Sequence, residues 1–149
     1  MRENRIYNVL FPLWMLMLFP QSWFIVLPGN FLIDSLVLFV CLCILKIKDK
    51  WIFFKNNILK IFLIGIISDI IGSAYMLAMP FIFNIESRMG DEPYLTVPAL
   101  LLSAVLIFLL NYFYTFKMCD KKLKIGMSLI FAVATAPYTF LIPSSLIYG

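Results

Sequence analysis

The stretch of the sequence that decides the fold is residues 58–79, ILKIFLIGIISDIIGSAYMLAM, whose only charged residues are Lys60 and Asp69. A helix needs about 20 predominantly apolar residues to cross the hydrocarbon core of a bilayer. This stretch is long enough, and Pro80 directly after it is a helix-breaking residue. Residues 58–79 therefore predict a transmembrane helix.

The composition of the whole chain supports the same class. Of its 149 residues, 63% are hydrophobic and 13% are charged, whereas soluble domains carry roughly 25% charged residues. A soluble domain of this length has too few polar residues here to cover its surface. We therefore expect an all-α integral membrane protein, with residues 1–149 forming one polytopic domain.

Four other apolar stretches flank this one, which gives a bundle of about five transmembrane helices. The predicted spans are residues 9–27, 31–45, 58–79, 98–116 and 125–147. Pro28, Gly29 and Asn30 predict a tight turn between the first two spans. Pro137 is expected to kink the last span, and Pro98 to begin the fourth. The alternative is that the proline-containing first stretch is re-entrant or in-plane, which leaves four spans.

The basic residues predict the orientation of the bundle. Most of the lysines fall in residues 46–60 and 117–124, and two arginines lie near the N-terminus. Short basic loops remain in the cytoplasm, so we expect the N-terminus and the 46–57 and 117–124 loops inside. Residues 84–97 and the C-terminus are then external. The expected partner is the lipid bilayer rather than nucleic acid, and the expected location is the cytoplasmic membrane of a bacterium.

Several kinds of chemistry are not expected. The chain contains no histidine, which excludes His-based acid–base catalysis and imidazole metal sites. Its three cysteines form no CxxC pair, and no glycine-rich phosphate loop occurs. No nucleophile–base pair can be assembled, so we expect neither an enzyme nor a bound metal or cofactor.

Asp69 is the first candidate for a functional residue, because it lies near the middle of the span 58–79. Gly65, Ser68, Gly72 and Ser73 share its helix face at spacings of three and four. Small residues allow a neighbouring helix to approach closely. The acid either binds a proton or cation, or donates a hydrogen bond within a packed helix interface. The sequence leaves both hypotheses open.

Three other polar residues are expected at the depth of Asp69. Counted from the cytoplasmic ends of their spans, Gln21, Ser22 and Thr135 reach the middle of the membrane. They stand beside prolines, and carbonyl groups in broken helices can coordinate ions. Gln21, Ser22, Thr135 and Asp69 therefore form a candidate ion or proton site; the alternative is that they serve helix packing and that the prolines only kink packed helices.

The remaining polar residues of the spans have simpler interpretations. Asn30 ends the predicted turn and Asp34 follows it closely, so either residue is expected to cap a helix near the outer headgroups. Asn111 is expected to cap or bridge near the cytoplasmic end of its span.

Two functions from different classes remain. The first is an accessory, assembly or regulatory subunit whose small-residue face docks on the helices of a membrane-protein partner. The alternative is a small transporter or channel, coupled to protons or cations through a midplane acid. Five short helices enclose little volume, so we expect such a transporter to form a homo-oligomer.

Overall fold

The structure is a computed structural model that describes residues 20–84 and 93–142, and this part of the chain is helical. Four segments are long and apolar enough to cross a membrane: Pro20–Ile44, Lys50–Phe83, Pro93–Thr115 and Lys121–Leu141. The helices are α1 (Trp23–Ile44), α2 (Lys50–Phe83), α3 (Pro93–Leu110) and α4 (Lys121–Ala134). A short 3-10 helix precedes α1 at Pro20–Ser22, and a second one, η5, follows α4 at Tyr138–Leu141. A π-helical turn follows α3 at Asn111–Thr115. The described fold is all-helical, with four helices that could span a membrane.

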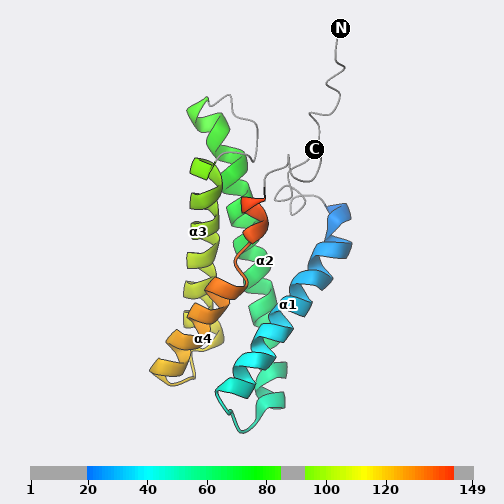
Figure 1. Cartoon of the computed structure of the whole chain (residues 1–149), viewed down its shortest axis with the longest axis vertical. Coiled ribbons are helices and arrows are strands. Elements are labelled where there is room, and N and C mark those ends of the chain that lie inside the picture. Colours follow the sequence, from blue (N-terminus) through cyan, green and yellow to red (C-terminus); the bar gives the residue numbers. More distant parts are fainter. Residues whose placement is uncertain (1–19, 85–92, 143–149) are drawn as a thin grey trace.

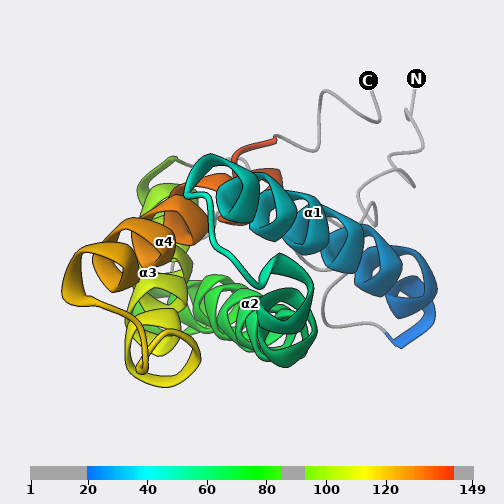
Figure 2. The same ribbon diagram turned by 90° about the horizontal axis from the view of Figure 1, so that it is seen from below.

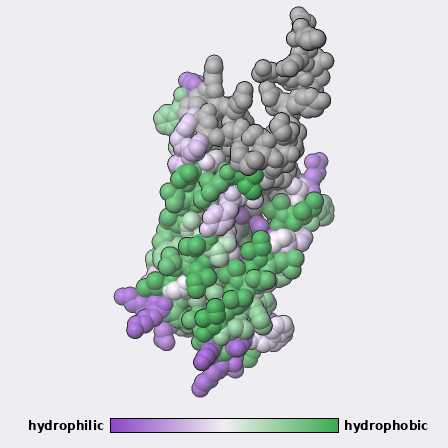
Figure 3. Space-filling model, viewed as in Figure 1, coloured by the Kyte–Doolittle hydropathy of each residue, from purple (hydrophilic) through white to green (hydrophobic). Residues whose placement is uncertain are grey.

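The long helices form a bundle in which each one contacts its neighbours in the chain. α2 packs against α1 and α3, α4 packs against α3, and α4 also touches α1 (Figures 1 and 2). The α1–α2 and α3–α4 connections lie at the same end of the bundle (Figure 1). This end is hydrophilic, whereas the surface beside the helices is mainly apolar (Figure 3). The two lysine-rich segments therefore share one end of the molecule.

The tight turn predicted at Pro28, Gly29 and Asn30 is wrong, because α1 continues through all three residues. Turn preferences reflect a chain in water, where a freed backbone group finds a new partner. In a bilayer the helix keeps its backbone groups bonded, and one proline removes only one donor.

The five-span count is not confirmed. Residues 23–27 of the first predicted span belong to α1, and residues 9–19 lie outside the described part of the chain. The re-entrant alternative and the position of the N-terminus concern the same undescribed residues and remain predictions.

The second helix begins earlier than predicted. α2 starts at Lys50, so most of the expected 46–57 loop is helical. The Trp51 ring stacks on Phe54 with centroids 5.8 Å apart, and Lys55 Nζ lies 5.2 Å from the Trp51 ring centroid. At 1.5 Å per residue, a helix of this length spans about 50 Å, which exceeds the ~30 Å hydrocarbon core. Its lysine-containing first turns can therefore extend into the headgroup region.

The boundaries of the later helices also differ from the predicted ones. α3 begins at Pro93 rather than Pro98, so a different proline takes the first helical position. The predicted span 125–147 is divided, because α4 ends at Ala134 and a short 3-10 helix follows Pro137. Residues 143–147 of that span lie outside the described part of the chain.

The interior is layered along the bundle axis. One apolar cluster lies toward the lysine-rich end and contains Leu38, Cys41, Leu42, Ile58, Ile61, Ile107, Phe116, Met127, Phe131 and Ala132. A smaller cluster contains Met76, Ala99 and Phe140. Polar residues occupy the level between the clusters: Ser68, Asp69 and Ser73 on α2, Ser103 on α3, and Thr135 after α4. The helices thus bring a polar layer together within an apolar bundle.

Candidate functional site

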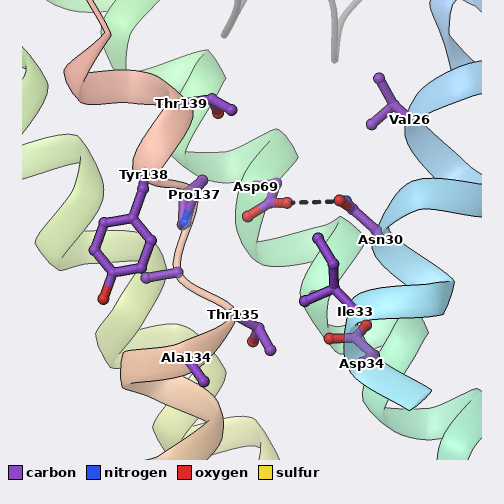
Figure 4. Close-up of a pocket in the computed structure, with 12 residues that line it drawn as sticks. Val26, Asn30, Ile33, Asp34, Asp69, Ala134, Thr135, Pro137, Tyr138 and Thr139 are labelled. Carbon is purple, nitrogen blue, oxygen red and sulfur yellow. Dashed lines mark hydrogen bonds between the residues drawn. The ribbon is translucent and has the colours of Figure 1, made fainter. Parts of the chain in front are cut away.

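A cavity of about 350 Å³ opens in this polar layer. Its walls come from α1, from α2 and from the segment between α4 and η5 (Figure 4). The lining residues are Val26, Asn30, Ile33, Asp34, Gly65, Asp69, Ala134, Thr135, Ala136, Pro137, Tyr138 and Thr139. The cavity therefore collects two carboxyl groups within a mainly apolar lining.

Asp69 lies in the wall formed by α2 and is only 5% exposed. Asn30 Nδ2 on α1 donates a hydrogen bond to Asp69 Oδ2 over 3.4 Å. The other carboxylate oxygen, Oδ1, is buried and has no hydrogen-bond partner among the described residues. Figure 4 shows this oxygen directed away from Asn30, toward the chain segment around Pro137. Asp69 thus presents an unoccupied acceptor to the cavity.

Asp34 is the second carboxyl of the site and is 4% exposed. Its Oδ2 atom lies 3.5 Å from the position that a Cβ atom on Gly65 would occupy. Gly65 and Asp69 are four residues apart on α2, so the contact places Asp34 about one helical turn from Asp69, ~5.4 Å along the axis.

The two carboxyls are close enough for their charges to repel each other. Among residues 20–84 and 93–142, no lysine or arginine compensates the charge of either group. A buried carboxylate without a cation is costly in a low-dielectric interior. Within the described part of the chain, an ionised site therefore has no positive counter-charge, and a bound cation would supply one.

The third wall of the cavity is the break between α4 and η5. Pro137 has no N–H, and the Tyr138 hydroxyl donates to the Val133 carbonyl that the proline would otherwise have bonded. The Tyr138 N–H donates to the Ala136 carbonyl over 2.8 Å. The Ala134 carbonyl thereby loses both of its usual helical donors, residues 137 and 138. The cavity wall thus contains a helix C-terminus with a freed carbonyl.

The structure brings together two of the four residues of the predicted ion site. Thr135 lines the same cavity as Asp69, and its hydroxyl donates to the Phe131 carbonyl over 2.8 Å. Gln21 and Ser22 lie in the 3-10 helix before α1 and do not line the cavity.

Sequence reasoning missed Asn30 and Asp34 as members of the site. They were expected to be caps near the headgroups, but both lie inside α1 and line the cavity. Their spacing of four residues is the signal that could have revealed them, because it places both on one face of a continuous helix. The predicted turn concealed that pattern.

The small-residue face of α2 packs within the chain itself. Ser68 and Ser73 are fully buried, and the Ser103 hydroxyl of α3 donates to the Ser68 carbonyl over 2.9 Å. A Cβ atom on Gly72 would lie 2.2 Å from Ser103 Oγ and 2.7 Å from the Phe140 ring. This face therefore carries the close contact of α2 with α3 and η5.

Asn111 has a local role that differs from a helix cap. It begins the π-helical turn after α3, and its Nδ2 atom donates to the Ile107 carbonyl one turn earlier, over 2.9 Å.

A search for protein metal ligands found no group of three or more His, Cys, Asp or Glu side chains in the described ranges. Comparisons with protein-family models, curated proteins and solved structures found no match to this chain. Function is therefore inferred from the geometry of the cavity.

Proposed function

We propose that the protein is a small membrane transporter or channel for protons or monovalent cations, with this cavity as its binding site. The observation that carries the proposal is that Asp34 and Asp69 are both buried against one cavity, with no basic partner in the described ranges 20–84 and 93–142. Acidic side chains inside helical bundles are costly, and they commonly mark ion or proton pathways.

The hydrogen bonds of Asp69 favour this function over a purely structural role. An acid that serves only to join helices is expected to use its oxygen atoms in hydrogen bonds. Asp69 uses one oxygen for Asn30, and the other is buried with no hydrogen-bond partner among the residues that the structure describes. A second buried acid, Asp34, adds charge repulsion that helix packing does not require. Both features are expected of a site that takes up a positive ligand.

The accessory-subunit hypothesis draws on the small-residue face of α2 as a docking surface. Ser68 and Gly72 on this face already contact α3 and η5 of the same chain. The face therefore offers less support for docking on a partner than its sequence pattern implied. A stoichiometric membrane partner in co-purification would restore that hypothesis.

In the proposed orientation, the connections that carry Lys46, Lys48 and the 117–124 cluster lie in the cytoplasm. This assignment follows the positive-inside rule and agrees with both connections lying at one end of the bundle (Figure 1). By the same rule the C-terminus is proposed to be external. The proposed setting is a bacterial cytoplasmic membrane, with a homo-oligomer completing the pathway.

Ion flux into liposomes tests the proposal directly. Purified protein is reconstituted, and a pH or cation gradient is imposed while an entrapped pH dye reports proton movement. Flux is expected for the unchanged protein and for Asp49→Asn, which alters an exposed acid outside the spans. Asp69→Asn keeps the shape and folds but is expected to abolish flux, because an amide cannot carry the charge. Absent flux, or equal flux in Asp69→Asn, contradicts the proposal.

A further inference from the structure

The geometry of the cavity points to a specific ligand, and this inference rests on the proposed function. We propose that the site binds one monovalent alkali cation in exchange for one proton. The cation is held between Asp69 Oδ1, the Asp34 carboxyl and the C-terminal end of α4.

The first ligand is the buried and unpartnered oxygen of Asp69. Oδ1 accepts no hydrogen bond from the described part of the chain, while Oδ2 accepts one from the Asn30 amide. The hydrogen bond fixes the carboxyl so that Oδ1 faces the cavity (Figure 4). Asp34 lies against Gly65, one turn along α2, so a cation between the two carboxyls can contact both.

The second contribution comes from the broken helix opposite Asp69. α4 ends at Ala134, which lines the cavity, and its carbonyl has no donor from residues 137 or 138. A helix C-terminus carries partial negative charge, equivalent to roughly half an elementary charge. Unwound carbonyls and half-helix C-termini coordinate alkali cations in transporters. The available ligands are oxygen atoms, which suit a hard cation.

The charged and titratable groups around the cavity set the stoichiometry. α1 contributes Asp34 and α2 contributes Asp69, while the segment after α4 contributes Tyr138, whose hydroxyl is bonded to Val133. α3 carries no acidic or basic side chain between Pro93 and Leu110. The site therefore holds two acids and no base.

Charge balance then predicts a one-for-one exchange. Two carboxylates about one turn apart in an apolar layer repel each other strongly when both are ionised. With both carboxyls protonated the site is neutral. Loss of one proton to water creates a single negative charge, which one monovalent cation neutralises. A divalent ion would need both carboxyls ionised and six to eight oxygen ligands if it were Ca²⁺.

Proton release on cation addition tests the exchange without requiring transport. Detergent-purified protein is placed in weakly buffered solution with a pH dye, and NaCl or KCl is titrated in. N-methyl-D-glucamine chloride controls for ionic strength. We expect saturable release approaching one proton per chain with sodium or potassium. Asp69→Asn should abolish the release, and the exposed-acid control Asp49→Asn should keep it.

Each result has a defined meaning. Equal release with N-methyl-D-glucamine, or release with only CaCl₂ or MgCl₂, overturns the proposal, as does full release from correctly folded Asp69→Asn. If that variant fails to fold, the ion series on the unchanged protein still decides. Flux in liposomes without cation-driven release retains the proposed function and rejects the exchange. Release without flux retains the binding site and rejects transport.

Discussion

Asp34 on α1 lies directly against Gly65 on α2, with its Oδ2 atom 3.5 Å from the place where a Cβ atom would stand. The contact places a buried carboxyl from another helix about one turn below Asp69. The contact joins residues 31 positions apart in the chain. It makes the site a pair of acids rather than a single intramembrane aspartate.

Gly65, Gly72 and Gly126, three of the helical glycines, should respond differently to alanine. Gly72→Ala should destabilise the protein by about 1–3 kcal/mol, the usual cost of overpacking, because its Cβ atom would lie 2.2 Å from Ser103 Oγ. Gly65→Ala adds an ordinary van der Waals contact and should be nearly neutral. Gly126→Ala has open space and should stabilise by up to about 1 kcal/mol through helix propensity. Thermal unfolding in detergent measures the series, and equal shifts for all three would contradict the packing.

The Tyr138 hydroxyl should stabilise the break in the last span. Tyr138→Phe leaves the Val133 carbonyl without its donor and should cost about 1 kcal/mol of unfolding free energy. Pro137→Ala restores a backbone N–H that can bond the same carbonyl. Adding Tyr138→Phe to Pro137→Ala should therefore lower the unfolding free energy only slightly. Tyr114→Phe, at a 66% exposed position, is the matched control. Additive costs in a double-mutant cycle would show that the hydroxyl does not replace the missing N–H.

The hydrogen bond between Asn30 and Asp69 should contribute weakly to stability. Its length of 3.4 Å is at the long end for such bonds, and interhelical hydrogen bonds in membranes average about 0.6 kcal/mol. A cycle of Asn30→Ala and Asp69→Ala, each of which removes one partner of the bond, should give a coupling energy near that value when measured by unfolding in detergent. Zero coupling would indicate that Asn30 does not hold the Asp69 carboxyl.

The proposed orientation predicts which cysteines react from each side of the membrane. In a cysteine-free background, Ser87→Cys should react with a membrane-impermeant maleimide in intact cells. Met118→Cys, at a position 91% exposed beside the lysine cluster, should react only after permeabilisation. The reverse pattern would show that the bundle has the opposite orientation in the membrane. Labelling of both from outside would place the two sites on the same side.

The thiol of native Cys119 should react slowly with a maleimide at neutral pH. Burial and the nearby Asp120 raise the pKa of its thiol above the ordinary value, and Lys124 only partly opposes them. The reactive thiolate is therefore scarcer at pH 7 than in an exposed cysteine. In permeabilised cells, the alkylation rate of Cys119 should rise at higher pH than that of the Met118→Cys variant. Superimposable pH profiles would contradict the effect of its surroundings.

Much of the architecture follows from the sequence alone, because it depends on properties local to each segment. Apolar length identifies helices that can cross a membrane, and the clustered lysines identify two basic connections. Helical periodicity places Ser68, Asp69 and Gly72 on one face, since residues three and four apart share a side of any α-helix.

Tertiary structure alone decided how these faces meet. Pro28, Gly29 and Asn30 favour a turn locally, yet they continue a helix, and this continuation brings Asn30 and Asp34 to Asp69. The register between helices likewise places Thr135 at the cavity and leaves Gln21 and Ser22 outside it. Periodicity within one helix says nothing of which residue of another helix lies opposite. That choice depends on side-chain packing between helices, as where Asp34 of α1 lies against Gly65 of α2.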